Sequence, residues 1–143
     1  MRVLVAESEP TRKAAIAAEL AQESAVDELT EVSDGMAAAT GAAGYDVVII
    51  DLDIWGLGSL GAIERICRID HAPAVLAIDS TGNKWKDYAA RAEGASDVLR
   101  WPSDAAKLRQ RLSALADGRR APAPVEAAPA GRRGLRRDVP SLR

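Results

Sequence analysis

The run Val47-Val48-Ile49-Ile50 constrains the fold more than any other stretch of this sequence. Consecutive β-branched residues are typical of a parallel strand that is buried on both faces. The run stops abruptly at Asp51, where the polar end of such a strand is expected. Because a strand of this kind needs helices on both sides of its sheet, the run predicts an α/β protein with a parallel central sheet.

Extended and helical patterns alternate along the first 117 residues. Short apolar segments predict strands at 3–6, 29–32, 47–50, 74–78 and 97–100. Apolar side chains at helical spacing predict helices from Pro10 to about residue 22, from Asp34-Gly35 onward, at 60–67, at 84–92, and after an N-capping Ser103. Five strand–helix units predict a doubly wound, flavodoxin-like α/β domain, with five parallel strands and helices on both faces.

The composition excludes several classes of function. Cys67 is the only cysteine, which excludes an internal disulfide framework and a Cys-based zinc site. His71 is the only histidine, which argues against a His-ligated metal site and a Ser-His-Asp triad. The sequence has neither an apolar run near the ~20 residues of a membrane helix nor a signal peptide, so we expect a cytoplasmic protein. It also lacks a Gly-rich phosphate loop and a nucleophile elbow, so we expect no catalytic residues and no enzymatic activity.

Acidic residues follow three of the predicted strands. The strands end in Glu7-Ser8-Glu9, in Asp51-Leu52-Asp53, in Asp79-Ser80 and, at the fourth exit, in Trp101-Pro102. Because the carboxyl ends of parallel strands meet at one edge of a sheet, these residues are expected to form one site. Clustered carboxylates repel one another unless a cation neutralises them, and hard oxygen ligands favour Mg²⁺.

Three segments resemble the receiver domain of bacterial response regulators: VLVAESEP (3–10), YDVVIIDLDIWGLG (45–58) and EGASDVLRWP (93–102). The resemblance covers about residues 1–117. It implies a part in two-component signal transduction, with a histidine kinase or a downstream target protein as partner. It also implies that Asp51 is the candidate phosphorylation site and that Glu7, Asp51 and Asp53 are the candidate metal ligands.

Three positions depart from the family's pattern. Ser8 stands where the family has a second metal-binding acid, so Mg²⁺ is expected to bind weakly if it binds at all. Trp101 stands where the family has a lysine before the proline, and an indole cannot supply the positive charge that stabilises a phosphoryl group. The family's switch Ser or Thr ends the fourth strand, but here the strand runs into Asp79, with Ser80 and Thr81 one and two places later. The sequence leaves open which of them faces the pocket.

The resemblance therefore leaves two hypotheses. The first is an atypical receiver, or pseudo-receiver, that acts by protein–protein contact with weak or no phosphorylation of Asp51. The second is a conventional Mg²⁺-dependent receiver that is switched by phosphorylation at Asp51. The missing charges favour the first hypothesis.

Residues 118–143 differ from the rest of the chain. They carry seven arginines against Glu126 and Asp138, a net charge of +5, so the first 117 residues carry −7 of the total of −2. Their Pro-rich and Ala-rich composition predicts a disordered tail beside a receiver-like domain at 1–117. Arginine pairs suit phosphate and carboxylate groups, so a third hypothesis is binding of a cyclic dinucleotide, a nucleic acid or another anionic partner by the tail arginines: Arg119, Arg120, Arg132, Arg133, Arg136 and Arg137.

Overall fold

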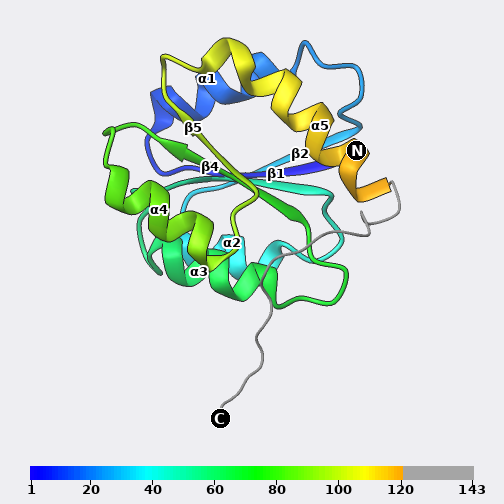
Figure 1. Ribbon diagram of the computed structural model, residues 1–143. Coiled ribbons are helices and arrows are strands. Elements are labelled where there is room, and N and C mark those ends of the chain that lie inside the picture. The colour runs from blue at the N-terminus through cyan, green and yellow to red at the C-terminus, as the bar shows by residue number, and fades with distance from the viewer. Residues whose placement is uncertain (121–143) are drawn as a thin grey trace.

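A five-stranded parallel sheet with strand order β2-β1-β3-β4-β5 forms the centre of the computed structural model, which describes residues 1–120 (Figure 1). The strands are β1 (Arg2–Ala6), β2 (Glu28–Val32), β3 (Val47–Asp51), β4 (Ala74–Asp79) and β5 (Asp97–Arg100). The helices are α1 (Pro10–Leu20), α2 (Gly35–Gly41), α3 (Ser59–Cys67), α4 (Lys84–Glu93) and α5 (Leu108–Arg120), with a short 3₁₀ turn, η1 (Ala105–Lys107), before α5. The predicted doubly wound α/β fold is confirmed.

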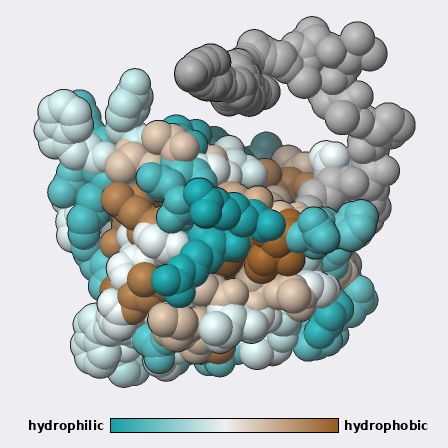
Figure 2. All heavy atoms as spheres, turned by 90° about the horizontal axis from the view of Figure 1, so that it is seen from below, coloured by the Kyte–Doolittle hydropathy of each residue, from teal (hydrophilic) through white to brown (hydrophobic). Residues whose placement is uncertain are grey.

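Strand β3 lies at the centre of the sheet and is buried along its whole length, as its β-branched run predicts. Val47 and Ile49 belong to an apolar core that α1 and α5 cover. Val48 and Ile50 belong to a second core, on the opposite face, that α2, α3 and α4 cover. Figure 2 views this second face from outside, where hydrophilic residues lie between separate exposed apolar areas. The strand therefore needs apolar side chains in both directions.

Polar side chains fix where three of the helices begin. The Glu9 carboxylate accepts hydrogen bonds from the backbone N–H groups of Thr11 and Arg12 at the start of α1. Asp34 accepts the N–H of Ala37 in α2, and Asn83 caps α4 in the same way. Each cap satisfies donors that the first helical turn leaves free.

The prediction that Ser103 caps the last helix is wrong. Residues 101–104 form turns, η1 follows Asp104, and α5 begins only at Leu108. Leu108 and Leu112 are buried as expected. Helix α5 continues through Arg119 to Arg120, beyond the expected domain boundary at 117, and the other tail arginines lie outside the described residues, so the division at 117 and the role of the tail stay predictions.

Strand β2 forms one edge of the sheet and pairs only with β1. Its side chains Glu28 and Glu31 are exposed, and Glu28 forms an ion pair with Arg2 of β1 at 2.8 Å. The guanidinium of Arg2 also lies 4.6 Å above the ring of Tyr45. A charged outer face of this kind discourages other strands from adding to the edge. Within residues 1–120, none of the helices has the length and apolar character that crossing a bilayer requires.

Candidate functional site: a buried carboxyl pair with an arginine

Glu7 and Asp51 form a buried carboxyl pair at the carboxyl ends of β1 and β3. The two strands pair with Ala6 opposite Ile50, so the next residue of each strand lies beside the other. Glu7 is 0% exposed and Asp51 is 2% exposed. Burial and the hydrogen bond with Asp51 raise the pKa of Glu7 to about 7. Near neutral pH the Glu7 carboxyl is therefore protonated in part of the molecules.

Arg12, from the first turn of α1, reaches into this pair. Its Nε donates a hydrogen bond to Glu7 Oε1 at 3.0 Å, and its Nη2 lies 3.8 Å from Asp51 Oδ2. Glu9 holds the helix start in place, because its carboxylate accepts the Arg12 backbone N–H at 2.6 Å. The same bond commits the Glu9 side chain to the helix cap. The pair is therefore neutralised from within the protein by a guanidinium.

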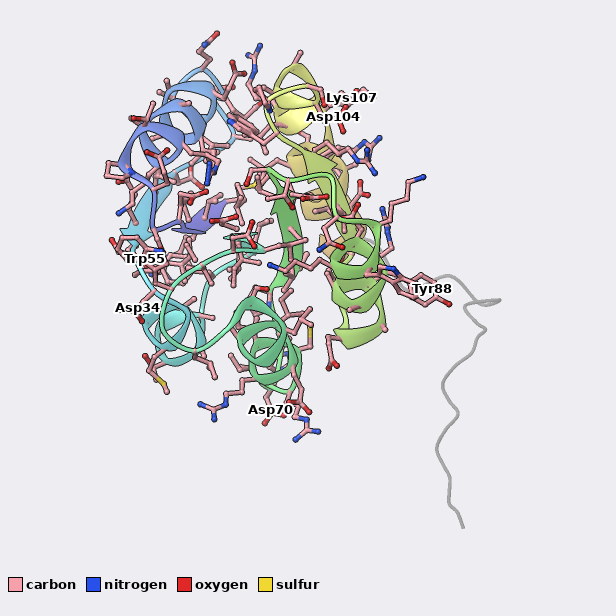
Figure 3. The ribbon with its side chains drawn as sticks, turned by 90° about the vertical axis from the view of Figure 1, so that its left-hand side faces the viewer. Asp34, Trp55, Asp70, Tyr88, Asp104 and Lys107 are labelled. Carbon is pink, nitrogen blue, oxygen red and sulfur yellow. The ribbon has the colours of Figure 1, made fainter. Side chains whose placement is uncertain are left out.

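Ser8 is turned away from the carboxyl pair and joins two neighbouring loops. Its hydroxyl donates to the backbone carbonyl of Ser33 at 2.7 Å and accepts the backbone N–H of Trp55 at 2.9 Å. Trp55 also forms a parallel β-bridge with Asp34, and the two residues lie side by side in Figure 3. The hydroxyl of Ser8 is thus engaged in holding the β3–α3 loop against the β2–α2 loop.

Asp53 pairs with a lysine of α4. Its backbone N–H donates to Asp51 Oδ1 at 3.1 Å, and its carboxylate forms an ion pair with Lys86. Asp53 and Lys86 also line a shallow groove of about 380 Å³ between the β3–α3 loop and the start of α3. A second cation from a helix therefore lies at the strand ends, bound to Asp53.

Asp79 is the last residue of β4, as the sequence predicts, and is 1% exposed. Its side chain points to the α4 face, away from Asp51. Oδ1 accepts hydrogen bonds from the N–H groups of Thr81 and Gly82, both at 2.9 Å, and from the Thr81 hydroxyl at 3.1 Å. Ser80 lies just beyond the strand and is half-buried.

A second carboxyl pair, on the α4 face, consists of Asp79 and Asp87. Asp79 Oδ2 and Asp87 Oδ1 are buried, and neither has a donor among the described residues. Burial and the adjacent Asp79 carboxylate raise the pKa of Asp87 to about 6. Burial opposes the ionisation of Asp79, but the interaction with Asp87 and the hydrogen bonds from Thr81 and Gly82 outweigh it and lower its pKa. Below about pH 6 the proton of the pair therefore lies on Asp87.

Trp101 and Arg100 lie on opposite faces, as strand alternation predicts. The Trp101 ring packs against the core beneath α1 and α5, and its backbone N–H donates to the Asp79 carbonyl at 2.8 Å. The peptide bond between Trp101 and Pro102 is cis. Arg100 Nη2 lies 3.6 Å from Asp87 Oδ2. Neither residue brings a positive charge to Asp51.

Comparison with known proteins identifies the fold. No protein-family model and no curated protein matches the sequence. Solved structures do match, among them NtrX from Brucella abortus, with 22% identity and a TM-score of 0.71 over 83% of this chain and 27% of that one. The signal receiver domain of NarL from Mycobacterium tuberculosis matches with 22% identity and a TM-score of 0.71, over 82% of this chain and 96% of its own.

A third match is the receiver domain of a sensor histidine kinase from Pseudomonas aeruginosa. It has 21% identity and a TM-score of 0.70, over 81% of this chain and 97% of its own. The structural neighbours are receiver domains. This chain has the receiver fold. The Pseudomonas structure has a magnesium ion coordinated in its active-site cleft.

The residues around Asp51 do not fit a magnesium ion in the same way. Arg12 bonds one oxygen of Glu7 and lies beside the outer oxygen of Asp51, and the Ser8 hydroxyl is engaged elsewhere. Within the part of the chain that is described, no group of three or more acidic, His or Cys side chains is placed to hold a metal ion. In this receiver fold, a guanidinium lies against the carboxylates that a metal would need.

Sequence reasoning missed Arg12 and Lys86. Arg12 follows the helix-capping Glu9 by three residues, which places it on the first turn of α1, above the end of β1. A basic residue at that spacing after an acidic strand end could have indicated an ion pair at the site. Lys86 gives no comparable signal, because it meets Asp53 only through the packing of α4 beside α3.

Proposed function

We propose that this chain is an atypical receiver of two-component signal transduction, cytoplasmic and not an enzyme, which acts by protein–protein contact without a phosphorylation switch at Asp51. The observation that carries this proposal is the Arg12–Glu7–Asp51 cluster, in which the acceptor position is already neutralised by an internal cation. A histidine kinase or a downstream signalling protein is the partner that the receiver fold suggests.

The chemistry of phosphorylation supports the proposal. An aspartyl phosphate adds close to two negative charges to a site that already holds two carboxyl groups. A conventional receiver balances these charges with a metal ion and a lysine. Here Trp101 replaces the lysine, and Arg12 is bound to Glu7. Each missing electrostatic contact costs ~2–4 kcal/mol, which slows the reaction by orders of magnitude at ~1.4 kcal/mol per decade.

Exposed aromatic side chains support the protein-contact role. Trp85 and Tyr88 of α4 are 82% and 74% exposed, and Trp55 is 69% exposed in the loop after Asp51. In Figure 3 the Tyr88 side chain projects away from the body of the protein. Aromatic side chains are enriched among the residues that dominate protein interfaces. The tail arginines add a candidate contact for an anionic partner, such as a nucleic acid or a cyclic dinucleotide.

Intact-mass measurement tests the proposal directly. The full chain is incubated with Mg²⁺ and acetyl phosphate, beside a conventional receiver domain as the positive control. We expect no phosphate increment on this chain and no change in its tryptophan emission with beryllofluoride. A phosphate increment that disappears in Asp51→Asn would instead establish the conventional Mg²⁺-dependent switch.

A further inference from the structure

We propose that Arg12 is the resident cation of the Glu7–Asp51 pocket, in place of a divalent metal ion, and that the pocket becomes a Mg²⁺ or Mn²⁺ site when the guanidinium is removed. The inference deepens the proposed function, because it gives the reason why metal-dependent chemistry at Asp51 is absent. It concerns binding of a metal ion alone, so it is tested without any phosphodonor.

The position of Arg12 carries the first step. Its side chain is only 20% exposed and lies against two carboxylates that are almost fully buried. Nε bonds Glu7 Oε1 at 3.0 Å, while Nη2 is 3.8 Å from Asp51 Oδ2, so one planar group faces both acids. A buried charge of this kind persists only when it is paired. Arg12 is therefore built into the pocket rather than resting on its surface.

The charge balance carries the second step. Buried carboxylates need positive charge beside them in a dry site. The guanidinium of Arg12 supplies it permanently, since arginine stays protonated in proteins. It lies against both Glu7 and Asp51, so a divalent cation could reach these oxygens only by displacing it.

The remaining ligands carry the third step. Without Arg12, the oxygens Glu7 Oε1 and Asp51 Oδ2 face the space that the guanidinium fills in the native protein. Mg²⁺ is commonly held by one or two carboxylates and completes its shell with water. Glu7 Oε2 keeps its hydrogen bond from the Glu9 N–H at 3.1 Å, which holds the Glu7 carboxylate in position. The pocket of an Arg12→Ala chain thus meets the minimum requirement for a hydrated divalent ion.

The experiment titrates MgCl₂ and MnCl₂ into the native chain, Arg12→Ala and Arg12→Lys, with isothermal calorimetry and thermal melting as readouts. We expect the melting temperatures of the native chain and Arg12→Lys to be unaffected by millimolar metal. We expect Arg12→Ala to bind one ion and to rise in melting temperature by several degrees as metal is added.

Arg109→Ala is the matched control. Arg109 of α5 pairs with Glu19 of α1 at 3.7 Å, on the same face of the sheet but outside the pocket. Its removal deletes a guanidinium without freeing Glu7 or Asp51, so no metal response is expected. The double variant Arg12→Ala, Glu7→Gln loses a ligand and is expected to lose the metal response of Arg12→Ala.

Three results would overturn the inference. The first is specific metal binding by the native chain that Glu7→Gln abolishes, and the second is a folded Arg12→Ala that binds no metal. If Arg12→Ala does not fold in the absence of metal, its folding is measured with Mg²⁺ present: recovery supports the inference, and failure to recover is the third contrary result. None of these results requires a phosphate increment at Asp51, so the proposed function stands or falls separately.

Discussion

The hydroxyl of Ser8 accepts the backbone N–H of Trp55 at 2.9 Å, and this one bond ties the end of β1 to the loop that follows Asp51. The same hydroxyl donates to the Ser33 carbonyl at 2.7 Å. Ser8 therefore links the β1–α1, β2–α2 and β3–α3 loops through hydrogen bonds. The serine that replaces the family's metal-binding acid thus has a structural role.

Ser8→Ala is expected to loosen the contacts between these loops and to lower the stability of the protein. Both hydrogen bonds are lost and a part-buried N–H is left without its acceptor, at a cost of ~1–3 kcal/mol in the free energy of unfolding. Urea unfolding measures the loss, and tryptophan emission reports the movement of Trp55. Ser80→Ala, in the β4–α4 loop, is the control and is expected to change neither. Equal stability of Ser8→Ala and the native chain would contradict this role.

Gly35→Ala is expected to destabilise the fold strongly. A Cβ at Gly35 would lie 1.7 Å from the backbone carbonyl oxygen of Leu57, so one of the two loops must move. The expected loss is ~3 kcal/mol or more, because the obstacle is backbone and cannot rotate away. Gly41→Ala in the same helix has nothing within 4 Å of its added Cβ and is expected to be neutral or stabilising. Similar melting temperatures for the two variants would refute the argument.

Asp87→Asn is expected to change how stability depends on pH. The pKa of Asp87 is raised to about 6 in the folded protein, above its value in the unfolded chain. The stability that its shared proton contributes is therefore complete at acid pH and is lost as the pH rises through about 6. An asparagine amide donates to Asp79 at every pH, so the variant should keep this contribution at neutral and alkaline pH.

Thermal melting between about pH 4 and about pH 7 measures the difference, because the loss falls between the unfolded and the folded pKa of Asp87. The native chain should lose stability relative to Asp87→Asn across this range. Asp70→Asn, at an exposed position after α3 (Figure 3), is the control and should follow the native chain. A native profile parallel to that of Asp87→Asn would show that no proton is shared with Asp79.

Trp101→Lys restores the charge that receivers have at this position, yet it is expected to lower stability without producing phosphorylation. The indole packs on the core beneath α1 and α5, and losing that contact costs ~2–3 kcal/mol. Arg12 still occupies the pocket, so no phosphate increment should follow. Trp85→Ala removes an indole that is 82% exposed and is expected to melt like the native chain. A phosphate increment on Trp101→Lys would show that the lysine alone was missing.

A chain that ends at Arg120 is expected to melt within a few degrees of the full chain. Among residues 1–120, side chains up to Leu115 already form both apolar cores, so the domain is expected to fold without residues 121–143. Calorimetry measures the change. A fall of more than ~8 °C, which corresponds to over ~1.5 kcal/mol for a domain of this size, would show that residues 121–143 pack on the domain.

The fold could be predicted from the sequence because its signals are local. The run 47–50 sets the central strand, and the alternation of faces follows from strand geometry, which correctly placed Arg100 opposite Trp101. The composition of the site at the strand ends was also readable. The sequence did not reveal the basic partner of each acid. Arg12 and Lys86 belong to helices, and tertiary packing determines how these helices are oriented toward the strand ends.

The pairing of Asp79 with Asp87 shows the same limit. Sequence alone placed Asp79 at the end of its strand but could not say which way its carboxylate turns. The direction is set by the N–H groups of Thr81 and Gly82, and Gly82 has a positive φ of 71° that turns the loop toward α4. Strand alternation places Asp79 on the face of Ala77, and these N–H groups hold its carboxylate there.

The outer edge of β2 has a consequence for assembly. Glu28 and Glu31 are both exposed on this edge strand, one on each face, and Glu28 pairs with Arg2 of β1. Two copies that met edge to edge would bring four carboxylates together across a hydrogen-bonded ladder, where like charges oppose pairing. The β2 edge is therefore expected to resist pairing with a second copy of this chain.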